Sequence, residues 1–596
     1  MKTRARSIDA KRNAGVLVVG AGPTGLTLAC ELLRRGVSCR IIDKAPAPAT
    51  TSRALGLQPR TLELFDRMGI IHEVLSAGGP VIDANLYDGH RLLLTISAAG
   101  VRSLATPYPR LWITPQTSVE EPLLSRLHAL GGRVERGREL ASFADVGDGV
   151  ISTVIRNDSD ETEEIGARWL VGCDGSRSRV RKALGVPFEG DTYDEKFLLA
   201  DVNLDWNRAR DRTHTWFPPA GMFTVFPLPG TSRWRIFAVM EDGSAPPVSL
   251  ELFRRLFRER TGDTTTTVSD PAWMSDFTIN RRMAARYRVG RTFLAGDAAH
   301  VHSPFGAQGM NTGIQDAYNL AWKLALVLAG NSPERLLDTY EEERFPVAKR
   351  VLSQTDANTR ILLSDNPLMR FVRERVITLD TVQNFIARRS SQLSVNYRAS
   401  SLSRSYHEPP MKMLPPRLGQ VAATGDRVRF RAGPRPGDRA PDGPAVSAAS
   451  GEETSLFREL RGTRFGLLLF GGTARTEAGY ANLATTARRA EERLPDDIRA
   501  HLIVAADEVP EELEENGSVL LDGSGALHGL YGARAEALYL VRPDGYVGLR
   551  GRPAREDKLV EYLGRLFTPA LRLSAARATS LASTADLPNR RAGSAK

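Results

Sequence analysis

Cysteine is scarce in this chain, with only Cys30, Cys39 and Cys173 among 596 residues. No two of them have the CxxC spacing of a zinc ribbon or a redox pair, and three thiols cannot staple a chain of this length. A disulfide-rich secreted protein is therefore excluded. We expect the chain to work in a reducing cytoplasm.

Long hydrophobic runs are missing as well. No stretch of about 18 apolar residues, the length that spans a bilayer, occurs in the sequence. The basic N-terminus, MKTRARSIDAKRNA, is not followed by an apolar stretch with a small-residue cleavage site, as a secretory signal would be. These absences predict a cytoplasmic protein without a membrane partner.

The excess of positive charge is modest. There are 80 Lys and Arg against 70 Asp and Glu, a net charge of +10, and no long basic block. This spread does not indicate a nucleic-acid partner. Hydrophobic residues (42%) and charged residues (25%) are near the averages of soluble globular proteins. The length predicts about three to five domains, so a soluble enzyme or binding protein remains.

A strand, helix and strand are predicted near the N-terminus. The β-branched run at 15–19 is typical of a strand buried on both faces of a parallel sheet. Leucine and alanine at helical spacing over 24–36 predict a helix that ends at Gly36, and residues 37–43 predict a second strand. This is the opening unit of an α/β, Rossmann-like domain.

The motif GAGPTG stands between the first strand and the helix. Gly20 makes the tight turn, Gly22 lets a pyrophosphate approach the backbone, and Gly25 lets the helix pack on the strand. Asp43 ends the second strand, where a carboxylate binds ribose hydroxyls. The dinucleotide contacts predicted from this region are Gly20, Gly22, Pro23, Thr24, Gly25, Asp43 and Lys44.

Two later segments identify the dinucleotide. They are WLVGCDGSRSRVRKALG at 169–185 and RTFLAGDAAHVHSPFGAQGMNTGIQDAYNLAWKLALVL at 291–328. Together with GAGPTG, they resemble the three fingerprints of the group A flavin-dependent aromatic monooxygenases, the family of para-hydroxybenzoate hydroxylase and phenol hydroxylase. The resemblance runs from about residue 14 to 400. It implies bound FAD and, because only one Rossmann-type fingerprint is present, NADPH or NADH as a transient reductant without a domain of its own.

The resemblance also implies roles within the third fingerprint. Asp297 is expected to bind the ribityl or ribose region of FAD, and Pro304 to line the space where substrate meets flavin, as a catalytic residue. The turn GAQGMN is expected to direct backbone amides at the pyrimidine edge of the flavin ring. Reduced flavin is anionic, so amide dipoles at a helix start suit it. The residues expected in this turn are Gly306, Gly309, Met310 and Asn311.

Further residues follow from the same resemblance. Asp174 and Gly175 match a DG motif that serves FAD and the nicotinamide, and Ser178 and Arg181 complete its pattern. Arg177 and Arg179 are additional cations, which either dock a nicotinamide phosphate or form a solvated arginine cluster.

Three positions concern FAD and the substrate. Arg53 matches an arginine that approaches FAD and is expected to be catalytic, and Gln116 matches a glutamine on the ribityl chain. Leu55 stands where phenol hydroxylase carries an aspartate that helps to deprotonate the phenol. Either the substrate ionises by itself or another group assists.

Short aromatic segments at 191–275 predict an inserted antiparallel sheet that binds the substrate. Aromatic residues on strands alternate between core and pocket, so only some of them are expected to touch the substrate. His300 belongs to the AAH part of the third fingerprint, for which the resemblance implies a structural role, and His300 and His302 at i, i+2 without a carboxylate as third ligand make only a weak metal site. The substrate candidates are His214, Trp216, Phe217, Met222, Phe223, Phe226 and Trp234, with His214, Phe217, Met222, Phe226 and Pro304 predicted to form the pocket.

The predicted domain order is discontinuous. FAD-binding residues at 14–190 and 276–400 enclose the sheet at 191–275, and a linker at 401–415 leads to a further α/β domain. That domain, at 416–568, resembles the thioredoxin-like C-terminal domain of phenol-hydroxylase-type enzymes but has no cysteine, which leaves it a structural or dimer-contact role in a homodimer. Residues 569–596 are expected to be a disordered tail.

The sequence thus predicts a monooxygenase that uses FAD, NAD(P)H and O₂ to hydroxylate a small aromatic substrate. The resemblance implies a flavin hydroperoxide attacked by an electron-rich ring. The segment SRALGLQPRTLE resembles enzymes that tailor polycyclic aromatic polyketides in actinobacteria, an antibiotic-biosynthesis setting. The alternatives are a Baeyer–Villiger or epoxidising oxygenase of the same fold, a related reductase or halogenase, and a non-catalytic flavin-binding interaction protein.

Overall fold

The computed structural model describes most of the chain, namely residues 13–51, 54–81, 83–97, 105–218, 221–240, 247–303, 306–363, 388–407, 430–473, 480–513 and 518–568. The predicted catalytic residues Arg53 and Pro304 and the predicted tail at 569–596 lie outside these ranges. Contacts divide the chain into two compact units, Met1–Ala325 with Asp338–Asn396 and Leu326–Leu337 with Tyr397–Lys596.

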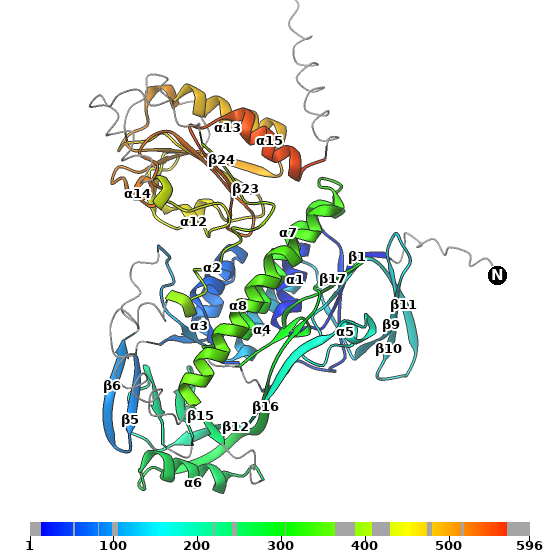
Figure 1. Ribbon diagram of the computed structural model, residues 1–596, viewed down its shortest axis with the longest axis vertical. Coiled ribbons are helices and arrows are strands. Elements are labelled where there is room, and N and C mark those ends of the chain that lie inside the picture. The colour runs from blue at the N-terminus through cyan, green and yellow to red at the C-terminus, as the bar shows by residue number, and fades with distance from the viewer. Residues whose placement is uncertain are drawn as a thin grey trace, which may run out of the picture. The chain divides into compact units, whose positions relative to one another are not determined.

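A sheet with a parallel centre begins the first unit (Figure 1), in the order β17-β18-β11-β1-β2-β8. β1 pairs in parallel with β11 and β2, β11 with β18, and β2 with β8. The predicted strand at 15–19 lies within β1, and Val16, Leu17 and Val18 are fully buried, as a sheet covered on both faces requires. The strands are β1 (Asn13–Val19), β2 (Cys39–Asp43), β8 (Val134–Arg136), β11 (Thr162–Gly172), β17 (Arg288–Val289) and β18 (Thr292–Leu294), with β9 (Arg138–Asp145) and β10 (Val150–Arg156) attached in antiparallel to β11.

Helices connect and cover these strands. α1 follows β1 directly, because Pro23 at its start has the helical φ built in and Gly22 serves as the N-cap residue. A separate three-stranded sheet consists of β3 (Gly56–Leu57), β7 (Trp112–Ile113) and β4 (Gly79–Pro80). The helices are α1 (Pro23–Leu33), α2 (Pro59–Met68), α3 (Ile71–Ser76), α4 (Gln116–Ala129), α5 (Arg179–Ala183), α7 (Gly309–Leu328) and α8 (Asp338–Leu363).

The first unit also contains the predicted antiparallel sheet, in the order β19-β16-β12-β15-β14-β13-β5-β6. The helix α6 (Leu250–Thr261) packs on one face of it and lies beneath β12 and β15 in the view of Figure 1. β5 and β6 come from residues 83–97, which the sequence analysis did not include, because their partner β13 is more than a hundred residues away. The strands are β5 (Asp83–Asp88), β6 (Arg91–Ser97), β12 (Phe188–Leu204), β13 (Arg212–Trp216), β14 (Phe223–Pro227), β15 (Arg233–Met240), β16 (Val268–Ala284) and β19 (His300–Val301).

The second unit is another α/β structure, with a sheet in the order β20-β27-β26-β23-β24-β25-β21-β22. β26 and β27 form an antiparallel pair around the Pro-Asp-Gly sequence at 543–545. Residues 404–407 form β20 and pair with β27, so this part of the predicted linker 401–415 belongs to the sheet. Its elements are β20 (Arg404–His407), β21 (Pro444–Ser447), β22 (Glu453–Ser455), α12 (Leu456–Glu459), β23 (Phe465–Phe470), α13 (Ala481–Arg493), β24 (Ile498–Val504), β25 (Val519–Leu521), α14 (Ala526–Tyr531), β26 (Ala537–Val541), β27 (Val547–Arg552) and α15 (Glu556–Leu566).

None of the helices in the described ranges is both long enough and apolar enough to cross a membrane.

Candidate active site

Four parallel strands bring the predicted motifs to one edge of the first sheet. β1 leads to Gly20, β2 ends at Asp43, β11 leads to Asp174, and β18 leads to Gly296. Parallel strands have their carboxyl ends at the same edge, which is where open α/β sheets bind ligands. The three fingerprints, separated by more than a hundred residues each, therefore converge.

The glycines of GAGPTG are held in close contact with this edge. A Cβ atom on Gly20, which has φ +102°, would overlap the Cys173 carbonyl, and one on Gly25 would overlap the Gly20 carbonyl. Gly22 faces open space, with no atom within 4 Å of its Cβ position. The start of α1 has no side-chain cap, so its first amides stay available. This cradle fits a pyrophosphate.

Asp43 and Gln116 lie in one polar cluster at this edge. Asp43 accepts hydrogen bonds from the amides of Ala21 (2.7 Å) and Ala45 (2.8 Å). Gln116 donates to Glu120 over 2.8 Å, and burial raises the pKa of Glu120. Arg136 lies 3.9 Å from Asp43. Sequence reasoning missed Glu120 and Arg136, since neither belongs to a motif.

Asp174 is a capping residue for α5. Its carboxylate accepts from the Ser178 hydroxyl (2.5 Å) and from the amides of Arg179 (2.7 Å) and Val180 (3.1 Å). Arg181 donates to the Ala298 carbonyl over 2.9 Å and so ties the second fingerprint to the third. The side chain of Asp174 thus shapes its loop.

The two further arginines of this segment, like Lys44, are exposed, but they differ in their contacts. Arg179 donates to the Ala141 carbonyl from two of its nitrogens, at 2.9 and 3.1 Å, whereas Arg177 is exposed. The nicotinamide role and the solvated cluster both stay predictions for these two residues.

The third fingerprint packs on the first. A Cβ atom on Gly296 (φ +61°) or on Gly313 would overlap the Thr24 hydroxyl. Thr24 therefore joins α1, the AGDAAH segment and α7 at one point. Asp297 is exposed, yet the surrounding protein raises its pKa by desolvation, against the opposing effect of His300.

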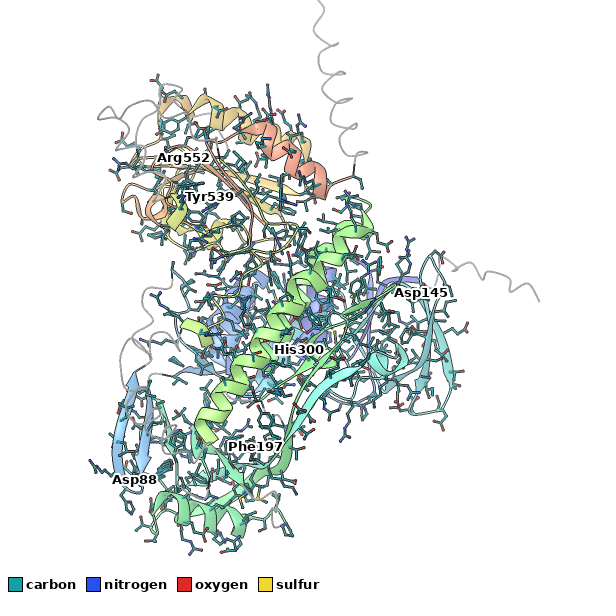
Figure 2. The ribbon with its side chains drawn as sticks, viewed as in Figure 1. Asp88, Asp145, Phe197, His300, Tyr539 and Arg552 are labelled. Atoms are coloured by element: carbon teal, nitrogen blue, oxygen red, sulfur yellow. The ribbon has the colours of Figure 1, made fainter. Side chains whose placement is uncertain are left out.

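A buried ionic cluster supports this fingerprint. Asp316 accepts from His300 (2.7 Å), from the Gly296 amide (3.0 Å) and from Arg344 (2.6 Å), and Asp316 and Arg344 are fully buried. Burial raises the pKa of Asp316, but Arg344 and His300 outweigh it and hold the pKa below its usual range. His300, labelled in the middle of the first unit in Figure 2, is thus buried in an ion pair with Asp316.

His302 is neutral. Burial lowers its pKa to about 4, and its Nδ1 lies 2.9 Å from the Ser303 carbonyl.

The sequence did not predict roles for Asp316 and Arg344, because their partners are remote in the sequence. The available signal was an acidic residue on an apolar helix.

The antiparallel sheet separates the predicted substrate residues by face. Trp216, Phe223 and Trp234 pack with α6 in one core cluster. His214 belongs on that side too, with its ring against Trp206 (4.9 Å between centroids). It is 1% exposed, and its nitrogens meet Tyr87 (2.9 Å) and the Ala209 carbonyl (3.1 Å). The prediction of His214 as a pocket residue is therefore wrong, because strand alternation points residues 214 and 216 toward α6.

The opposite face, which we call the aromatic face, carries the other candidates. Phe217, Met222 and Phe226 pack there in a second cluster, and Phe217 and Phe226 are half-buried. Phe197 (Figure 2), Phe237 and further rings complete it, with centroid separations of 5.6–6.3 Å. The aromatic face consists of Tyr193, Phe197, Phe217, Met222, Phe226, Phe237, Val239, Phe277 and Ile279.

Comparison with known proteins agrees with this geometry. The family model described as "FAD binding domain" matches residues 13–355. The chain is 37% identical to a flavin-dependent monooxygenase of Mycobacteroides abscessus over 565 residues, covering 92% of this chain and 99% of that protein. It is 38% identical to 6-methylpretetramide 4-monooxygenase of Streptomyces rimosus over 562 residues, covering 92% and 93%.

A solved structure matches the chain over a similar length. Aklavinone-11 hydroxylase, in a ternary complex with FAD and aklavinone, aligns with a TM-score of 0.73 at 26% identity and covers 93% of this chain and 98% of its own. The α/β hydroxylase fold therefore extends over nearly the full length. The resemblance seen in the three fingerprints is confirmed: the chain belongs to the FAD-binding family of flavin-dependent aromatic monooxygenases and is an FAD-dependent aromatic hydroxylase.

Proposed function

We propose that this enzyme hydroxylates a phenolic or polycyclic polyketide substrate, with NADPH or NADH as reductant. The observation that carries this proposal is the aromatic face. Its rings lie on strands of the same sheet as β19, in which Met283 of β16 pairs with His300 of the third fingerprint. Aromatic and methionine side chains bind planar aromatic molecules through area and stacking. Relatives named for pretetramide and aklavinone support the polycyclic class.

The roles of the individual residues form part of the proposal. Gly20, Gly22 and the start of α1 receive the pyrophosphate, and Asp43 and Gln116 face the adenosine and ribityl parts of FAD. Asp297 serves the ribityl or ribose region. The exposed position of Asp297 and the open space beside Gly22 support this assignment.

Bound FAD supplies electron transfer from the nicotinamide to O₂ and transfer of oxygen to the aromatic ring. The chain's own residues position the substrate and shield it from water. The aromatic face holds the ring system in a water-poor environment, and the amides at the start of α7 stabilise negative charge. Arg53 and Pro304 remain the proposed catalytic residues, and Leu55 cannot take a proton, so we propose an acidic phenol that ionises without a base at that position.

The test is the flavin absorption spectrum during anaerobic addition of NADPH, with and without a panel of phenolic and quinonoid polycycles. We expect slow bleaching alone and faster bleaching with one class of compound, followed in air by a hydroxylated product. A lactone or ring-opened product would instead support the Baeyer–Villiger alternative. Reduction that no compound accelerates, with no product, would refute the proposal.

We further propose that the second unit is a thioredoxin-like domain with a structural or dimer-contact role. An α/β sheet whose strands β23–β27 are buried, in a region without cysteine, supports this. Sedimentation of the full chain and of a chain ending near residue 400 would test it. We expect the full chain to be dimeric and the shorter one monomeric; equal association states would refute the dimer-contact role.

A further inference from the structure

Side chains hold the first two carbonyl groups of the GAQGMN turn. The Gly306 carbonyl accepts from Gln58 Nε2 (2.7 Å) and Gln308 Nε2 (2.9 Å). The Ala307 carbonyl accepts from Asn311 Nδ2 (2.7 Å). Ala307 has φ +50°, a conformation that is costly for alanine and persists only where the surroundings enforce it. The turn is therefore fixed in one backbone orientation.

That orientation leaves the amides of the turn free. The first intrahelical bond of α7 runs from the Thr312 amide to the Gln308 carbonyl over 2.9 Å. Within the described ranges, the amides of Gly309, Met310 and Asn311 have no acceptor. They form the positive end of a 20-residue helix. Because the Gly306 and Ala307 carbonyls accept hydrogen bonds from side chains, the turn presents its amides and not these carbonyls.

Gln392, in a distant part of the chain, holds the side chain of Gln308 in place. Its Nε2 donates to Gln308 Oε1 (2.5 Å) and to the Thr312 hydroxyl (3.2 Å), and its Oε1 accepts from Gln315 Nε2 (2.5 Å). It is 3% exposed and has φ +59°, a conformation in which a buried glutamine is rare. A residue held in this way has its carboxamide in one position.

The hydrogen bonds run in one direction through the three glutamines. Gln315 donates to Gln392, Gln392 donates to Gln308, and Gln308 donates to the carbonyls of Gly306 and Ser390. A carboxamide has one acceptor end and one donor end. Since Gln392 occupies the acceptor end of Gln308, the donor end must point to the turn. Without that donor, Gln308 Oε1 would be buried and unsatisfied, which favours release of the turn.

We propose that Gln392 is a positioning residue for the flavin. Through Gln308 it holds the GAQGMN turn with its amides directed at the bound ring, and it thereby increases the affinity for FAD and makes the flavin easier to reduce. This inference rests on the proposed placement of those amides at the flavin.

The test compares Gln392→Met with a matched control, Gln354→Met. Methionine has nearly the length of glutamine but no donor. Gln354→Met removes one hydrogen bond to the same segment, the bond that Gln354 accepts from Arg389 (3.0 Å), and none to the turn. Gln392→Met removes the hydrogen bonds to Gln308, Thr312 and Gln315. Because the bond to Gln308 is the one that acts on the turn, we expect FAD binding by the apoprotein to weaken about tenfold, the effect of one buried hydrogen bond, and the midpoint potential to become more negative. Gln354→Met should match the wild type in both.

Two further measurements make the outcome decisive. Hydrogen exchange of the apoprotein should be faster over residues 306–315 in Gln392→Met, with the rest of the chain unchanged. Gln392→Glu supplies a donor only when its carboxyl is protonated, so its FAD affinity should approach the wild-type value at low pH and fall as pH rises, relative to the wild type at each pH. The pH dependence of Gln392→Glu still tests the proposal if Gln392→Met does not fold.

The proposal is overturned if folded Gln392→Met has wild-type affinity, potential and exchange, or if the Gln392→Glu affinity ratio does not change with pH. Such a result would leave the proposed hydroxylation intact, because wild-type turnover is measured separately. Conversely, a wild-type protein that binds FAD but hydroxylates no aromatic compound would refute the proposed function and leave this comparison standing.

Discussion

The two faces of the antiparallel sheet are both rich in aromatic residues, but they differ in what covers them. Leu252, Phe253, Leu256 and Phe257 of α6 pack on the first face, whose large side chains are almost all fully buried. On the aromatic face, Phe217, Phe226, Phe277 and Tyr193 remain half-buried. Aromatic composition therefore does not distinguish the two faces, whereas the exposure of their side chains does.

The polar groups differ between the faces in the same way. On the α6 side, hydrogen bonds of 2.9 Å link the buried residues His214, Tyr87 and Asn85, and Asn85 accepts a further one from the exposed Thr95. Buried polar groups that are hydrogen-bonded to one another contribute to stability. Substitutions on the two faces should therefore separate stability from substrate binding.

The largest effect is expected on the α6 side. Phe223 is fully buried in the cluster under α6. Phe223→Ala should lower the free energy of unfolding by about 3–5 kcal/mol, through lost burial and the cavity left behind. Urea unfolding monitored by tryptophan fluorescence measures it. A loss below about 1 kcal/mol would show that this face is not the core described here.

His214 should make stability depend on pH. Burial lowers its pKa to about 4 from an ordinary value near 6.5, so the unfolded chain binds the proton more readily between these values. The contribution of the neutral His214 to the free energy of unfolding is complete above pH 6.5. It is lost as pH falls toward 4, and the total loss is at most about 3 kcal/mol. His214→Gln should flatten the pH dependence of unfolding in this window, whereas His72→Gln, at an exposed site, should not.

Phe226 should reverse the pattern seen for Phe223. Because Phe226 is half-buried on the aromatic face, its truncation removes less core. Phe226→Ala should raise the KM for the accelerating polycycle about tenfold, or about 1.4 kcal/mol, with a smaller loss of stability than Phe223→Ala. Steady-state kinetics and unfolding on the same sample decide. An unchanged KM with a large stability loss would assign Phe226 to the core.

The smallest effect is expected from a threonine pair on the side of Phe217 and Phe226. The hydroxyls of Thr215 and Thr224 lie 3.2 Å apart on neighbouring strands. A double-mutant cycle with Thr215→Val and Thr224→Val should give a coupling of about 0.5–1.5 kcal/mol in stability, the value of one hydrogen bond. A coupling of zero would mean that the two hydroxyls have separate partners.

Local patterns predicted much of the fold and of the cofactor site. The β-branched run of β1, the glycines of GAGPTG and the proline at the start of α1 determine a strand, a turn and a helix within about twenty residues. The error at His214 has a local cause too. Alternation shows that residues 214 and 217 lie on opposite faces, but it does not show which face a helix covers.

The sequence by itself therefore determined the family, the cofactor and the motifs that meet it, because these depend on neighbours in the chain and on fixed backbone requirements of glycine. Only the tertiary structure decided which aromatic residues are core, and that Asp316 joins Arg344 and Gln392 joins Gln308 across 84 residues. Such contacts arise when separate elements pack, and no local propensity encodes the partner. The role of a buried polar group can be assigned only when its hydrogen-bond partner is known.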